Sequence, residues 1–176
     1  IGINEIEGIF HTHCHDDHFS GLTALMRADH RIKYFATSVV RASVFKKLAA
    51  LMSKEESLVA SYFDFFDLQF DDWNNIEGLE VRPFLSPHPV ETSVLSFRTF
   101  WEGRYITYSH LADIASFKVM RDMFDEAPAK NGFDQSQFDK VRKEYLANVD
   151  LKKIDVGGGM IHGAAEDFQE DSSGKI

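Results

Sequence analysis

The sequence predicts a layered fold of the α/β or α+β class, in which helices cover the faces of β-sheets. Short segments rich in β-branched and aromatic residues alternate along the chain with longer stretches of helical periodicity. Elements in this order pack as layers around a hydrophobic core. The 176 residues are 44% apolar, which is enough for one chain to bury such a core. We expect one domain over residues 1–176, without internal repeats or linkers.

The first part of the chain is expected to contain two strands and one long helix. Residues 6–13 fit a short strand, residues 20–26 the start of a helix, and residues 32–36 a second strand. Between about 38 and 66, apolar residues recur at helical spacing. They include Val40, Val44, Leu48 and Leu51. We therefore expect one long helix in that range.

The second part of the chain is expected to form a further sheet and two helices. Strands are predicted at 79–84, 93–98 and 104–108, the last two joined by a turn at Glu102-Gly103. Helices are predicted at 114–126 and 135–149, with Asp134 and Gln137 placed like a capping box. A last short strand at 153–156 leads into three consecutive glycines. These elements would complete the layered fold.

The charge and the single cysteine limit the classes of partner. The formal net charge is −9 and no cluster of Lys and Arg is visible, so we expect no nucleic-acid ligand. No apolar stretch is long enough to span a membrane, and the first residues lack the basic and apolar regions of a signal peptide. Cys14 is the only cysteine, so no intrachain disulfide can form. We expect a cytoplasmic protein that acts on a small-molecule substrate and that can form a homo-oligomer.

Three of the eight histidines fall within six residues, in the run His13-Cys14-His15-Asp16-Asp17-His18. Residues two apart in a strand share a face, so His13 and His15 can point at one metal ion. Asp17 and His18 follow where the chain turns toward the next helix, and they can point at a second position beside the first. Burying these groups without a metal would leave several polar atoms to be paired. The run therefore predicts a metal site.

The spacing His-x-His-x-Asp-His, which starts at His13, resembles the signature of the metallo-β-lactamase superfamily. Members of this superfamily share an αββα sandwich with metal ions at one edge of the two sheets. Later residues resemble the remaining ligands of that family and occur in the same order. They are His88 after a strand, Asp113 after the next strand pair, and His162 before Gly163. The resemblance covers roughly residues 6–168.

The resemblance implies a role for each ligand. One metal ion would be held by His13, His15 and His88, the other by Asp17, His18 and His162, and Asp113 would bridge the two. The carboxylate of Asp113 can bridge two cations, whereas His110 in the same loop is the competing candidate for that position. The donor set suits two divalent ions, above all Zn²⁺, with Fe or Mn as alternatives. A hydroxide bridged between the metals would be the nucleophile, and Asp17 would orient it or carry a proton.

Three further residues are expected to support the site or to have no role in it. If Asp113 is the bridging ligand, His110 would contact a ligand residue or face the substrate. His11 shares the strand face of His13 by parity and would support the site, although a packed histidine explains it equally well. Cys14 points to the opposite face and is expected to be a small buried residue.

The chain also departs from the family pattern. Family members have a β-rich segment of some tens of residues before the first motif, whereas twelve residues precede His13 here. The first strands are therefore expected to be missing, as in an abbreviated fold or a fragment of a longer chain. Residues 12–15, 109–113 and 157–163 resemble, more narrowly, a bacterial subgroup in which the domain is often fused to a cyclic-nucleotide-binding domain.

The resemblance implies a metal-dependent hydrolase of an ester, thioester, lactone, amide or phosphodiester bond. A di-iron protein that reduces oxygen or nitric oxide is an alternative, although the flavodiiron proteins of the family carry Glu at the position of His15. A second alternative is a sensory or regulatory domain that binds metal without turnover.

Overall fold

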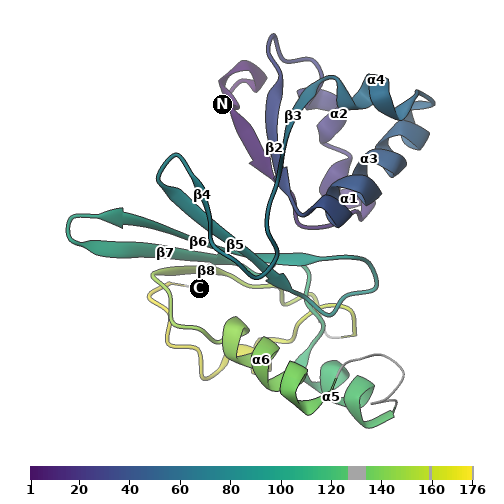
Figure 1. Ribbon diagram of the computed structural model, residues 1–176. Helices are drawn as coiled ribbons and strands as arrows, with labels where there is room; N and C mark the ends of the chain where they lie inside the picture. The colour runs from purple at the N-terminus through teal and green to yellow at the C-terminus, as the bar shows by residue number, and fades with distance from the viewer. Residues whose placement is uncertain (127–133, 159, 176) are drawn as a thin grey trace.

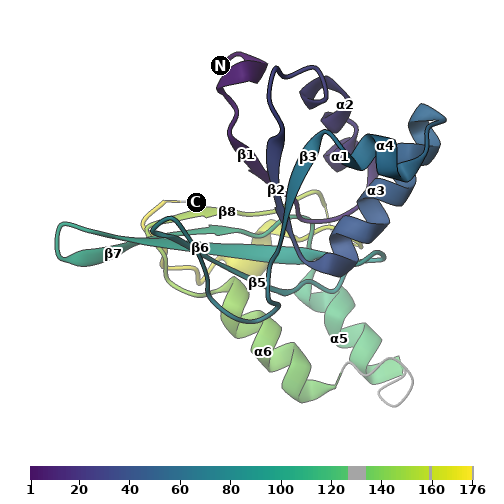
Figure 2. The ribbon, with the colours of Figure 1, turned by 45° about the horizontal axis from the view of Figure 1, so that its top comes forward.

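The chain folds into two β-sheets that lie between two groups of helices (Figure 1). The computed structural model describes residues 1–126, 134–158 and 160–175, with the backbone alone at 124–126. Helices α1–α4 lie on the outer side of the first sheet, and α5 and α6 lie on the outer side of the second sheet (Figures 1 and 2). The predicted α/β (α+β) layered fold is therefore confirmed.

The first sheet is parallel and carries four helices on one face. Its strands are β1 (Gly8–Phe10), β2 (Ile32–Ala36) and β3 (Phe63–Asp67), in that order. The helices are α1 (Asp16–Phe19), α2 (Leu22–Leu25), α3 (Ser38–Met52) and α4 (Glu56–Ala60). Val44 and Leu48 of α3 are fully buried against Tyr34 and Phe63 of the sheet, so this apolar face fixes α3 on the first sheet.

The second sheet is mostly antiparallel. Its strands lie in the order β4 (Asn74–Ile76), β5 (Leu79–Leu85), β6 (Ser93–Trp101), β7 (Arg104–His110) and β8 (Leu151–Lys153), and only β7 and β8 pair in parallel. Helices α5 (Phe117–Glu126) and α6 (Gln135–Tyr145) cover its outer face. Met120, Phe138 and Tyr145 are buried there with Phe84 and Val94 of the sheet. A short 3₁₀ helix at each end of the chain, Ile3–Glu5 and Ala165–Phe168, completes the described elements.

A separate group of apolar residues joins the two sheets. Phe35 of the first sheet is buried with Val81 and Leu95 of the second. Phe10 stacks on Phe35 with 4.8 Å between ring centroids and meets Phe97 edge-on at 5.0 Å. This contact holds the end of β1 against the second sheet, where the histidine run begins.

The predicted helix over 38–66 is wrong in its second half. α3 ends at Met52 because Ser53 takes a left-handed conformation (φ 51°), and its N–H donates to the carbonyl of Ala49. After the short helix α4, the aromatic run Phe63-Asp64-Phe65-Phe66 forms β3 beside β2. Phe63 is fully buried while Phe66, three positions on and therefore on the opposite face of the strand, is 46% exposed.

Other predicted boundaries shift, and one strand was not expected. The strand predicted at 6–13 is shorter, because the chain leaves the sheet after Phe10. Helix 20–26 is present as α2, and α1 precedes it. Helices 114–126 and 135–149 begin or end three to four residues inside those bounds, and the last strand ends at Lys153 instead of Val156. Strand β4 was missed, because three residues carry too little periodicity to predict.

The start of α6 carries half of the predicted capping box. The carboxylate of Asp134 accepts a hydrogen bond from the N–H of Gln137 at 2.9 Å. No helix in the described parts of the chain is long and apolar enough to cross a membrane.

Candidate metal centre

The segments that carry the predicted ligands meet at one edge of the two sheets. His13 lies in the loop after β1, where it forms an antiparallel bridge with Thr92 just before β6. His15 is the N-terminal flanking residue of α1, which carries Asp17 and His18 in its single turn. The other candidates lie in loops of the second sheet: His88 between β5 and β6, Asp113 after β7, and His162 after β8. The edge therefore gathers ligands from both sheets.

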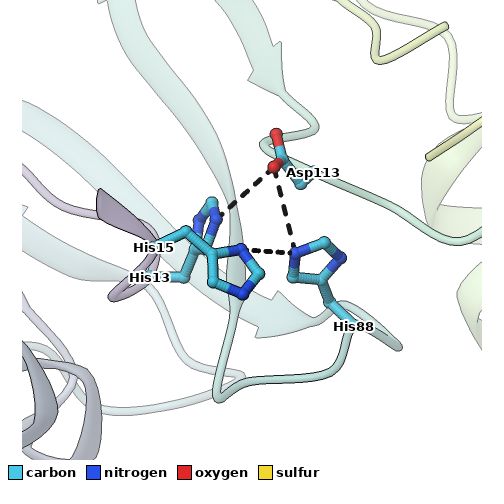
Figure 3. Close-up of side chains that lie close together, drawn as sticks. All are labelled: His13, His15, His88 and Asp113. Carbon is cyan, nitrogen blue, oxygen red and sulfur yellow. Dashed lines mark hydrogen bonds and ion pairs between the residues drawn. The ribbon is translucent and has the colours of Figure 1, made fainter. Parts of the chain in front are cut away.

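Asp113 lies at the focus of the cluster. Its carboxylate oxygen Oδ2 is 3.5 Å from Nε2 of His13, 3.3 Å from Nε2 of His18 and 3.9 Å from Nε2 of His88 (Figure 3 shows His13 and His88). The Asp113 side chain is only 10% exposed, so little water screens these approaches. One carboxylate oxygen thus lies among three imidazole nitrogens, an arrangement of donor atoms that could hold a metal ion.

His15 and His88 present their ring nitrogens to each other. Nδ1 of His15 lies 3.0 Å from Nε2 of His88 (Figure 3). The other nitrogen of His88, Nδ1, lies 3.1 Å from the carbonyl oxygen of Ile161, and because a carbonyl only accepts, Nδ1 carries the proton. The lone pair of His88 is therefore on Nε2, which faces the cluster.

The ring of His13 gives the strongest indication that the cluster can bind a metal ion. Its side chain is fully buried, and Nε2 has no hydrogen-bond partner in the described structure, while Nδ1 lies 3.0 Å from the hydroxyl of Thr12. Burial, followed by the neighbouring imidazoles of His18, His88 and His15, lowers the pKa of His13 to about 2. Burial also lowers the pKa of His88. Neutral imidazoles with inward lone pairs fit a metal ion, and a buried nitrogen without a partner is costly otherwise.

The ligand atoms form three overlapping groups that all include Asp113. In each group the atoms lie within 4.8 Å of one another. The groups are His13, His15, His88 and Asp113; Asp17, His18 and Asp113; and Asp113, Asp155 and His162. The structure thus brings together the residues expected for the first metal ion, and Asp17 with His18 beside them.

The position of His162 agrees less well with the prediction than the positions of the other candidate ligands. It lies with Asp113 and Asp155 but shares no such group with Asp17 and His18, the residues with which it was expected to act. Nδ1 of His162 lies 2.9 Å from a carboxylate oxygen of Asp155, so the Nε2 atom is left for a metal ion. The assignment of the seven residues as ligands stays a prediction.

The remaining candidates lie outside the three groups. Nδ1 of His110 accepts a hydrogen bond from the N–H of Ala112 at 3.1 Å, and Asp113 rather than His110 occupies the shared position. His11 is buried with its ring 5.5 Å from that of Tyr34, and burial lowers its pKa to about 4. Cys14 is buried in the core of the first sheet, as expected of a small apolar residue.

Sequence reasoning missed Asp155, which orients His162. Its Oδ2 accepts from His162, from the N–H of Ile114 and, at 3.4 Å, from the N–H of Gly163, while Oδ1 accepts from the N–H of Gly157. The imidazole and backbone donors hold the pKa of this carboxyl below its usual value, although burial opposes them. The sequence signal that could have identified Asp155 is its position after the last strand, seven residues before the candidate ligand His162.

Replacing Asp155 by asparagine is expected to weaken metal binding at the position served by His162 by about 10- to 100-fold. The amide cannot accept the histidine proton as a carboxylate does, so the imidazole loses its orientation and part of its basicity. Competition with a chromophoric chelator would measure the affinity. Asp167→Asn is the matched control, because within the described part of the chain that carboxylate accepts from backbone N–H groups alone, those of Phe117 and Ala164. An equal weakening in both variants would mean that Asp155 acts only by holding the loop.

Comparison with solved structures identifies the fold. The metallo-β-lactamase fold protein YhfI of Bacillus subtilis aligns over 99% of this chain and 64% of its own, with a TM-score of 0.60 and 14% identity. The Rm3 metallo-β-lactamase aligns over 85% of this chain and 57% of its own, with a TM-score of 0.50 and 12% identity. The chain therefore has the metallo-β-lactamase fold, as its motifs predicted.

Comparison with characterised sequences points to particular relatives. The chain is 31% identical over 104 residues to a cGMP-dependent 3',5'-cGMP phosphodiesterase A of Dictyostelium discoideum, and 27% identical over 119 residues to a cAMP/cGMP-dependent 3',5'-cAMP/cGMP phosphodiesterase B of the same organism. The matches cover 59% and 66% of this chain but only 12% and 11% of those proteins. No family model matches the chain.

Proposed function

We propose that this chain forms a metal-dependent phosphodiesterase site. The observation that carries the proposal is the position of Asp113, whose Oδ2 lies 3.5 Å from Nε2 of His13 and 3.3 Å from Nε2 of His18. Two adjacent cation positions suit the transfer of a phosphoryl group, because both the attacking and the leaving oxygen can be stabilised. The phosphodiesterase names of the two Dictyostelium relatives favour this bond among those that the fold serves.

The residues divide into two ligand sets around Asp113. His13, His15 and His88 would hold one ion, and Asp17, His18 and His162 the other. Imidazole nitrogens with carboxylate oxygens suit Zn²⁺, and Fe or Mn accept the same donors. When bound, such ions lower the pKa of water and offset the negative charge that develops on the phosphate.

Asp17 is the residue we propose to handle protons. Its side chain is 78% exposed, and its carboxylate lies 3.5 Å from Nε2 of His18. An accessible carboxylate at the rim of the cluster can accept a proton from the attacking water and pass it to solvent. The buried Asp113 lacks that access.

The experiment tests hydrolysis and metal content together. Protein purified without added metal is analysed for bound metal, then assayed with bis(p-nitrophenyl) phosphate, 3',5'-cGMP and p-nitrophenyl acetate. We expect two divalent ions for each chain, and diester hydrolysis that stops when a chelator removes them. The double variant His13→Ala, Asp17→Ala should lose the activity, while Asp16→Ala, a change in the neighbouring carboxylate outside the three groups, should keep it.

Two results would replace the proposal with an alternative. A stoichiometric iron centre with an iron absorption spectrum and no hydrolysis would favour redox chemistry. Bound metal with equal background rates for the native chain and the double variant would leave a metal-binding regulatory domain.

A further inference from the structure

A cavity of about 330 Å³ lies between the end of β1 and helices α1 and α2. It borders the proposed metal centre, because His18 is part of its wall. Among the described residues, no lysine, arginine or carboxylate contributes to its wall. The apolar lining side chains are Ile9, Phe10, Leu22 and Leu25, and the polar ones besides His18 are His11, Thr12 and His110. A charged group would find no counter-charge there, so the cavity suits a neutral group.

His110 gives the cavity one hydrogen-bond donor. Its Nδ1 accepts from the N–H of Ala112, so the proton of the neutral ring sits on Nε2. Burial, followed by the nearby charge of Lys153, lowers the pKa of His110 and keeps the ring neutral. Among the described residues, no group accepts a hydrogen bond from this Nε2–H. His110 shares the polar part of the wall with His11, Thr12 and His18, and a donor without a partner selects a ligand that carries an acceptor.

We propose that this cavity binds the base of a nucleotide-type phosphodiester, and that the Nε2–H of His110 donates a hydrogen bond to an acceptor on that base. The inference rests on the proposed function, which puts the phosphate at the metal centre beside His18. A planar heterocycle is uncharged, apolar on its faces and rich in acceptors at its edge, and these properties match the wall. His110 is thus a substrate-binding residue, and the reacting phosphate lies with the metal ligands.

Equilibrium binding to the zinc-loaded protein tests the inference without requiring turnover. Guanosine 5'-monophosphate and methyl phosphate share a phosphate monoester, but only the first carries a base. By isothermal titration calorimetry we expect the native protein to bind the nucleotide about tenfold more tightly. His110→Phe removes the donor, and Leu25→Trp narrows the cavity without changing His110. Each variant should reduce the ratio of the two dissociation constants to about twofold and leave methyl phosphate binding unchanged.

Two further variants sharpen the test. His110→Gln keeps an N–H donor on the side chain and should restore part of the preference, whereas His30→Phe, at an exposed histidine outside the cavity, should change nothing. Equal binding of both ligands to the native protein would overturn the inference. So would an equal weakening of both ligands in His110→Phe, because His110 would then act through the loop of Ala112 and Asp113.

Failure of the proposed function gives a different result. In that case the native protein would hydrolyse no diester, yet the preference for the nucleotide and its loss in the variants would still be measured. A hydrolase without the preference would retain the function and exclude this cavity as the base site.

Discussion

Replacing Asp113 by asparagine is expected to lower kcat/KM for diester hydrolysis by more than about 1000-fold. Changing a residue that only supports a metal ligand typically costs about 10- to 100-fold, and Asp113 belongs to every ligand group of the centre. Asparagine has nearly the same size, but it is neutral and offers only one oxygen, so it cannot serve two cations. The nitrogen atoms of His13 and His18 would then face an amide in place of the carboxylate oxygen that lies 3.5 and 3.3 Å away.

Metal content should fall together with the rate. Elemental analysis of the Asp113→Asn variant is expected to find less than two ions for each chain at zinc concentrations that saturate the native protein. Asp16→Asn is the control, since its carboxylate lies in the same turn but outside the ligand groups. A variant that kept both ions and lost only the rate would show that Asp113 acts on the substrate and is not a shared ligand.

The cluster of candidate ligands was more predictable from the sequence than the elements that hold it. His13, His15 and His18 are close in sequence, so the local chain geometry already brings them near one another. His88 and Asp113 are 73 and 98 positions beyond His15, and only the order of motifs in a known family connected them to the run. The structure supplies the physical reason, because the loops after β5 and β7 end at the same sheet edge as the loop after β1.

The predictions from the sequence failed where tertiary contacts decide which structure a segment forms or which role a residue has. The segment at 63–66 is aromatic on both faces, so its pattern alone did not separate a helix from a strand. Pairing with β2 settled it, because Phe63 fills the core of the first sheet. Asp155 was missed for a similar reason: a lone acid after a strand has no role until His162 folds back onto it. The cavity beside His110 also depends on residues from four separate segments.

In the metal-free protein, His11 and His13 together are expected to lower the free energy of unfolding by roughly 4 kcal/mol when the pH falls from 7 to 5, and the lowered pKa values of His88 and His110 act in the same direction. Both His11 and His13 are held neutral by burial, with pKa values of about 4 and about 2, whereas in the unfolded chain their pKa is near 6.5. Below pH 6.5 the unfolded chain therefore binds two protons that the folded chain rejects. The free energy of unfolding must fall as the pH falls, by roughly 2 kcal/mol for each histidine over this interval.

Urea denaturation at a series of pH values, with a chelator present, would measure how the free energy of unfolding changes with pH. The interval between pH 7 and pH 5 isolates the histidines, because paired carboxylates such as Asp155 lose their stabilising effect mainly below pH 5. His11→Leu is the matched variant, since it removes one buried imidazole that belongs to no ligand group and should remove roughly 2 kcal/mol of the change. Stability that stayed constant over the interval would mean that the cluster accepts protons in the folded state. Such a cluster would not keep the inward lone pairs on which metal binding depends.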